Sequence, residues 1–161
     1  MNPVAASLQA AIEETLEQVA FTPVMPVAEP FDWSAPDLAW ASIRLEVALR
    51  GELVCAASPA TLAALAHDAW GGDGGDVNPS ESFLLEVANI IGGRLLATLF
   101  PRVEPALGLP MFGAGARAPG KDALMLCFEV EAGRIGVFLE IGSEIPELLP
   151  PVTDTISGGG S

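Results

Sequence analysis

Residues 80–100 constrain the fold more than any other part of the chain, because their pattern predicts one long helix with two unlike faces. At about 100° per residue, mainly apolar residues gather on one side of the helical wheel: Leu84, Val87, Ala88, Ile91, Leu95, Thr98 and Leu99. The opposite side carries small and polar residues: Ser82, Glu86, Asn89, Gly93 and Ala97. An ordinary solvated face would carry several charged residues. The apolar face is therefore expected to pack in a hydrophobic core, and the other face is a candidate contact surface.

Both ends of this helix are marked in the sequence. Asn78 suits the N-cap, Pro79 the first turn and Glu81 a capping-box position, and Pro101 ends the helix. These signals confine the helix to one continuous element of about 21 residues.

The remaining segments predict an α+β domain with a single antiparallel sheet built from two hairpins plus an extra strand. The long helix and two further helices are expected to pack on one face of that sheet. The predicted elements are a helix over 4–20, a Pro-rich non-helical segment over 23–36, a hairpin over 39–57 turning at Arg50-Gly51-Glu52, a helix over 59–70, one short strand within 104–120, and a second hairpin over 122–141 turning at Ala132-Gly133.

The length of 161 residues fits one domain, which we assign to residues 1–150. The segment IPELLPPV at 145–152 would add a short helical turn. Residues 151–161 end in Gly-Gly-Gly-Ser, the composition of an artificial flexible linker, and are predicted to be a flexible tail.

Charge and hydropathy exclude several classes of function. The formal net charge is −14, and no cluster of Lys and Arg exists to bind phosphates, so nucleic acid and anionic membrane surfaces are unsuitable partners. No uninterrupted apolar run reaches the roughly 18 residues that suggest a membrane span, and the N-terminus lacks the basic and apolar regions of a signal peptide. We expect a cytoplasmic protein.

Cysteine and histidine are too few for most metal sites and nucleophilic enzymes. Cys55 and Cys127 each fall in a predicted strand, which favours buried free thiols over a disulfide or a metal pair. His67 is the only histidine and has no Cys or His at ligand spacing. The segment GGDGGD at 71–76 lacks the preceding strand and the following Lys-Ser/Thr of a phosphate-binding loop. We therefore predict no metal site.

The contact face of the long helix has two possible interpretations. Gly92 and Gly93 each cost about 1 kcal/mol relative to Ala, so Gly92 is expected to admit a neighbouring backbone and Gly93 to let a partner approach closely. Glu86 alone could be a solvated position that pairs with Arg94 or with a strand residue. Asn89 is harder to explain that way, since Asn is a poor helix former. The E-x-x-N pair alone leaves both interpretations open.

The pattern Ser82-x-x-x-Glu86-x-x-Asn89, inside LLEVANIIGG, resembles the signature of the CheC/CheX family of chemotaxis phosphatases. The similarity covers most of residues 5–145: an N-terminal helix, a hairpin before the signature helix, a Gly-Leu-Pro element after it and a closing hairpin. Pro110 corresponds loosely to a proline of the family pattern. The CheC branch often carries two Glu/Asn signatures, whereas this chain has one in its later half, as in the CheX-like branch.

The resemblance implies a phosphatase that hydrolyses the aspartyl-phosphate of a CheY-type response-regulator receiver. Asn89 would orient the attacking water and Glu86 would bind the receiver's active-site Lys. An acyl phosphate is already activated, so orienting the water matters more than deprotonating it. The receiver would carry Mg²⁺ on its own acidic cluster, and this chain would need no cofactor of its own.

Other residues of the same helix would then contact the receiver. Ser82 would be a helix-positioning or rim contact, and Gly93 a point of close approach. Three apolar side chains would form a collar against the receiver: Leu85, Ile90 and Leu96. The family also implies a homodimer formed through sheet edges, for which the strands within 124–141 are suited.

Two alternatives come from other classes of function. One is a non-catalytic adaptor that binds receivers, and the other is an assembly module like the related flagellar switch components. An intact Glu86 and Asn89 pair favours the phosphatase over both.

Overall fold

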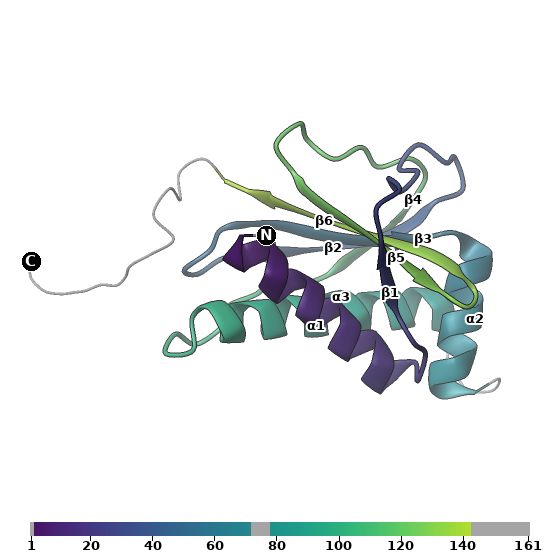
Figure 1. Cartoon of the computed structure of the whole chain (residues 1–161), viewed down its shortest axis with the longest axis horizontal. Coiled ribbons are helices and arrows are strands. Elements are labelled where there is room, and N and C mark those ends of the chain that lie inside the picture. Colours follow the sequence, from purple (N-terminus) through teal and green to yellow (C-terminus); the bar gives the residue numbers. More distant parts are fainter. Residues whose placement is uncertain (1, 72–77, 143–161) are drawn as a thin grey trace, which may run out of the picture.

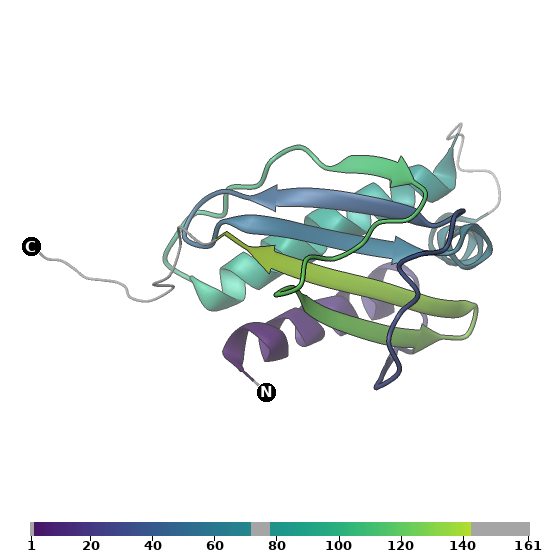
Figure 2. The same ribbon diagram turned by 90° about the horizontal axis from the view of Figure 1, so that it is seen from above.

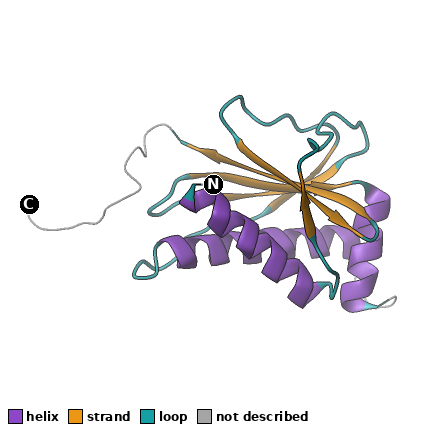
Figure 3. Ribbon diagram, in the orientation of Figure 1, coloured by secondary structure: helices purple, strands orange, loops and turns teal. Residues whose placement is uncertain are grey.

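A sheet of six antiparallel strands forms the centre of the molecule, and three helices cover one of its faces (Figures 1 and 3). The computed structural model describes residues 2–71 and 78–142. The strands lie in the order β1-β5-β6-β3-β2-β4. The elements are α1 (Pro3–Val19), β1 (Met25–Val27), β2 (Ala39–Leu45), β3 (Gly51–Ala57), α2 (Pro59–Trp70), α3 (Pro79–Leu99), β4 (Met111–Ala114), β5 (Leu124–Val130) and β6 (Gly133–Ile141). The predicted α+β class with one antiparallel sheet is confirmed.

All three helices begin with the same short sequence motif. A capping residue accepts a hydrogen bond from a backbone N–H of the first turn, and proline follows it at the first helical position. Asn2 accepts from Ala5 at 2.7 Å, Ser58 from Thr61 at 3.2 Å and Asn78 from Glu81 at 3.2 Å. The predicted starts of α2 and α3 are confirmed.

The main core lies between the sheet and the helices. It combines the inward side chains of β2, β3, β5 and β6 with one face of each helix. The largest fully buried members include Phe83, Phe128, Leu8, Ile12 and Leu53. Cys55 is part of this core, and both cysteines are buried and free, as predicted.

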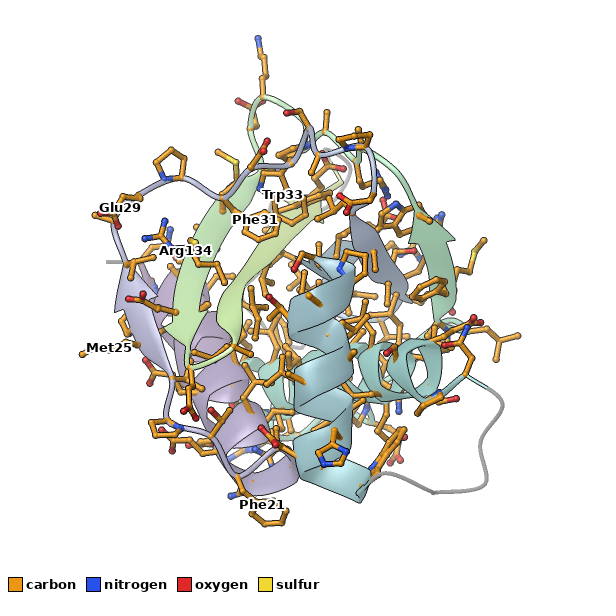
Figure 4. The ribbon with its side chains drawn as sticks, turned by 90° about the vertical axis from the view of Figure 1, so that its right-hand side faces the viewer. Phe21, Met25, Glu29, Phe31, Trp33 and Arg134 are labelled. Carbon is orange, nitrogen blue, oxygen red and sulfur yellow. The ribbon has the colours of Figure 1, made fainter. Side chains whose placement is uncertain are left out.

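A smaller hydrophobic cluster covers the opposite face of the sheet. The Pro-rich segment that follows β1 crosses this face (Figure 2), and its Phe31 and Trp33 rings meet edge to face at 4.8 Å between centroids. Trp33 in turn packs against Phe138 of β6 at 4.9 Å. Arg134 of β6 lies 3.7 Å from Glu29 in the same segment (Figure 4). The segment therefore covers apolar sheet surface that would otherwise be exposed.

The strand β1 was not among the predicted elements, because Pro26 interrupts its short pattern. Proline has no N–H to donate, so it is tolerated only where a strand pairs on one side. β1 meets that condition, since it lies at the edge of the sheet and pairs only with β5.

The pairing of β1 with β5 also places both strands of the 124–141 hairpin inside the sheet. The expectation that they supply a free dimer edge is therefore wrong, and the outer strands are β1 and β4.

The turn of the first hairpin comes earlier than predicted. β2 ends at Leu45, and residues 46–50 connect it to β3, with Ala48 in the left-handed region at φ 72°. Gly51 is a strand residue rather than a turn residue. A Cβ atom at this position would lie 2.1 Å from the Glu140 backbone oxygen of β6. The glycine is required by close approach of two strands, which a local sequence pattern does not reveal.

Among the described residues, α3 is the one helix whose length and composition would suit a membrane span, with a mean hydropathy of 1.4. Packing inside the domain explains its apolar residues, because its inner face packs against β2 and β3 while α1 and α2 pack beside it. The glycine-rich segment over 71–76 beyond Gly71, the predicted helical turn over 145–152 and the predicted tail over 151–161 lie outside the described residues.

Burial of the two thiols predicts a loss of stability at alkaline pH. Burial raises the pKa of Cys55 to about 12, and it raises the pKa of Cys127 as well. The folded chain therefore holds protons that the unfolded chain releases above the ordinary thiol pKa of 9.0. The free energy of unfolding should be unaffected by Cys55 below pH 9 and fall by about 1.4 kcal/mol per pH unit between pH 9 and 12. Cys127 should add to the loss in the same direction.

Urea denaturation in reducing buffer between pH 8 and 11 would measure this slope. The chain has no tyrosine and one lysine, so few other groups titrate in this range. Cys55→Ala should make the slope shallower. An unchanged slope in that variant would show that another group causes the alkaline loss.

Candidate functional site

The outer face of α3 presents a carboxylate and a carboxamide to solvent. Glu86 and Asn89 are both exposed, three residues apart on one side of the helix, and Ser82 and Gly93 extend the same stripe at partial exposure. We call these four residues the α3 stripe. The opposite side is buried: Phe83, Leu84, Val87, Ala88, Ile91, Gly92, Leu95 and Leu96. The predicted division of faces is confirmed at most positions, although Thr98 is exposed.

Glu86 does not pair with Arg94, which was the simplest alternative explanation for it. The guanidinium of Arg94 reaches α1 instead, where it donates a hydrogen bond to Gln18 and lies 3.8 Å from Glu14. Within the described part of the chain, neither Glu86 nor Asn89 has a hydrogen bond or ion pair from its side chain. Both polar groups are therefore available to a partner.

The two consecutive glycines of α3 have different surroundings. A Cβ atom on Gly92 would meet three side chains, with Leu107 nearest at 3.3 Å and Ile43 next at 3.5 Å. Gly92 thus serves close packing, although side chains rather than the expected backbone approach it. A Cβ atom on Gly93 would meet nothing within 4 Å. Gly93 leaves open space directly beside the α3 stripe.

The predicted apolar collar is only partly at the surface. Leu85 and Ile90 are partly exposed, although Leu85 also packs against the core. Leu96 is 2% exposed and belongs to the main core. Its predicted contact with a partner is therefore wrong, because this side chain is covered by other core residues although it lies on nearly the same side of the helix as Asn89.

The shape of the site suits a macromolecular partner. The stripe lies on the outside of a helix, whereas small-molecule sites are usually concave. A groove of about 720 Å³ lies elsewhere, around Arg44, Arg50, Lys121 and Glu140. In residues 2–71 and 78–142, no three His, Cys, Asp or Glu side chains are grouped to hold a metal ion. A carboxamide that both donates and accepts can orient a water molecule, and an exposed carboxylate can bind a cation.

Comparison with known proteins identifies the fold. No family model matches the sequence, and no curated protein matches it. Solved structures do match. A chemotaxis protein CheX from Desulfovibrio desulfuricans superposes with a TM-score of 0.72 at 18% identity, over 88% of this chain and 100% of that one. The CheX–CheY–BeF3–Mg²⁺ complex from Borrelia burgdorferi matches with a TM-score of 0.65 at 17% identity, over 84% of this chain and 96% of that one.

The chain therefore has the fold of CheX and CheC-like chemotaxis proteins. The same architecture also occurs in a solved structure of another name. The FliM middle domain from Vibrio alginolyticus matches with a TM-score of 0.58 at 11% identity, over 91% of this chain and 100% of that one. At these identities the likeness defines the fold, and an activity must be argued from the site itself.

Two exposed aromatic residues near the start of α3 were not found from the sequence. Phe21 follows α1 directly and is 74% exposed, and Trp70 ends α2 and is 38% exposed. Neither belongs to the periodic pattern of α3. The available signal for Phe21 was a bulky residue just after a helix C-cap, where glycine is usual, whereas Trp70 is followed by Gly71 and carried no such signal.

The two glycines predict opposite outcomes for the same substitution. Gly93→Ala should increase the free energy of unfolding by roughly 0.5–1 kcal/mol, because it adds helix propensity without a clash. Gly92→Ala should increase it less or decrease it, because Leu107 must shift. Chemical denaturation of both variants would measure the difference. A larger gain for Gly92→Ala would contradict these surroundings.

Proposed function

We propose that this chain is a CheX-like phosphatase that hydrolyses the aspartyl-phosphate of a CheY-type receiver domain. The observation that carries the proposal is the exposed Glu86 and Asn89 pair, which makes no side-chain bond within the described structure. The CheX fold supports it, as does the similarity to a CheX protein solved in complex with CheY, BeF3 and Mg²⁺.

Asn89 would act on the attacking water. Its carboxamide oxygen can accept a hydrogen bond from that water, while its NH₂ group can donate to the phosphoryl oxygens. An in-line attack needs the water held opposite the leaving carboxylate. Because α3 packs against the sheet, α1 and α2, this side chain starts from a fixed backbone position.

Glu86 would bind the receiver rather than act as a base. Its carboxylate, one turn before Asn89, can form a charge-assisted hydrogen bond with a lysine of the receiver's active site. That contact would fix the register of docking and withdraw the lysine from the phosphoryl group. Mg²⁺ would be held by the receiver's own acidic residues, and this chain would contribute no ligand to it.

A receiver-binding adaptor without catalysis is the competing function, since the same α3 stripe could recognise a receiver without hydrolysing it. An assembly role is the other, favoured by the similarity to the FliM middle domain. Dependence on phosphorylation separates these classes. A phosphatase or an adaptor should prefer the phosphorylated receiver, whereas an assembly module should not.

Asn89→Ala should abolish hydrolysis while the chain stays folded, because residue 89 faces solvent. The test is the decay of a ³²P-labelled receiver with Mg²⁺, alone and with catalytic amounts of each protein. Thr98→Ala, exposed elsewhere on the same helix, is the matched control and should keep full activity. If Asn89→Ala accelerates decay as well as the unmodified chain does, the assignment of the water-orienting group is wrong.

Glu86→Ala should reduce both receiver affinity and turnover, each by about tenfold or more, as expected for loss of a charge-assisted contact. Glu131→Ala removes an exposed carboxylate on the β5–β6 turn and should change neither quantity. Equal losses in the two variants would indicate a general effect of net charge rather than a specific contact at Glu86.

A further inference from the structure

The two exposed aromatic residues of the described chain lie at the ends of α1 and α2. Among seven phenylalanines and three tryptophans, all within the described residues, Phe21 and Trp70 are the two classed as exposed, at 74% and 38%. Both lie at the end of the helix layer where α1 and α2 end and α3 begins (Figures 1 and 2). Their location at the start of the helix that carries Glu86 and Asn89 calls for a functional explanation.

Phe21 is unfavourable for the isolated chain in two respects. Its backbone is left-handed, with φ at 55°, in the position after the α1 C-cap where glycine is usual. Its side chain is 74% exposed and gains little from burial. Figure 4 shows Phe21 beyond the end of α1, at the outer side of the helix layer. A strained backbone that holds an apolar ring in solvent indicates a contact made outside the chain.

Trp70 connects this region to the α3 stripe. Its ring meets Phe83 edge to face at 5.7 Å between centroids. Phe83 lies three residues before Glu86 and seven before Ile90, so the three side chains follow one flank of the helix. Trp70 therefore borders the Glu86 end of the stripe, with 38% of its surface left uncovered.

The contact between α1 and α3 places Phe21 near the same end. Arg94 of α3 bonds Gln18 of α1, and the two helices run in opposite directions (Figures 1 and 2). Three residues beyond Gln18, Phe21 lies further toward the start of α3. Trp70 thus extends the flank of α3 that carries Ile90 and Arg94, and Phe21 lies at the same end of the helix layer.

We propose that Phe21 and Trp70 form an aromatic rim that anchors the receiver domain beside the α3 stripe. This inference rests on the proposed function, because it names the receiver as the occupant of a surface continuous with Glu86. Charge favours such an anchor. A chain of net charge −14 gains little long-range attraction to an acidic phosphorylation site, so affinity must come from apolar contact. Aromatic side chains provide the most apolar contact per residue and dominate binding hot spots.

Phe21→Gly is the decisive variant because it separates binding from stability. Glycine suits the left-handed backbone, so the melting temperature should stay the same or rise. The KM for the phosphorylated receiver should rise about tenfold, with kcat unchanged within about twofold. Trp70→Ala should raise KM similarly. Met125→Ala is the matched control, since Met125 is 54% exposed on the opposite face of the sheet, and it should change nothing.

A fluorescence titration tests the contact without turnover. Adding a BeF3-activated receiver should change the emission of Trp70, and the change should disappear in Trp70→Phe, because Trp33 is buried and Trp40 partly so. The proposal is overturned if KM is unchanged in both rim variants while Asn89→Ala is inactive. It is also overturned if ultracentrifugation finds a dimer that Phe21→Gly dissociates, because the rim would then bind a second copy of this chain.

Failure of the proposed function has a different signature. In that case the unmodified chain leaves the decay of every receiver tested unchanged, and Asn89→Ala behaves identically. A receiver-induced change in Trp70 emission would then still support the rim as an adaptor surface. No change in emission would reject it.

Discussion

The apolar face of α3 packs against the sheet, and the other two helices pack beside α3 on the same face of the sheet. Its buried leucine, isoleucine and valine side chains meet the inner faces of β2 and β3, with α1 on one flank and α2 near its start. Each such side chain contributes about 1.5–3 kcal/mol when removed from water. Because this packing fixes both the rotation and the position of α3, it also determines which residues of the helix reach solvent.

The packing of α3 also fixes the positions of the polar residues on its outward face. Glu86 and Asn89 stand on a helix whose other sides are held, so their separation and direction are set before any partner arrives. Arg94, bonded to Gln18, ties α3 to α1 rather than neutralising Glu86. The result is a polar pair on a rigid convex surface, a geometry suited to entering the active site of another protein rather than enclosing a small molecule.

The pattern of α3 could be read from sequence because a helix repeats its faces every 3.6 residues, and the caps at Ser58 and Asn78 act locally. The predictions from sequence that failed concern residues whose surroundings are formed by distant segments of the chain. Pro26 lies in a strand because β1 is at an edge, Gly51 is required by the backbone of β6, and Leu96 is covered by the core. None of these neighbours is close in sequence, so local patterns could not reveal them.

The sequence by itself determined the helices, both long hairpins and the face on which Glu86 and Asn89 lie, because period and capping depend on residues within a few positions of each other. Only the tertiary structure decided that Glu86 is unpaired, that space above Gly93 is open, and that Phe21 and Trp70 are exposed at one end of α3. Exposure and the absence of a partner depend on what every other segment covers. They are properties of the packed chain, and no single segment contains them.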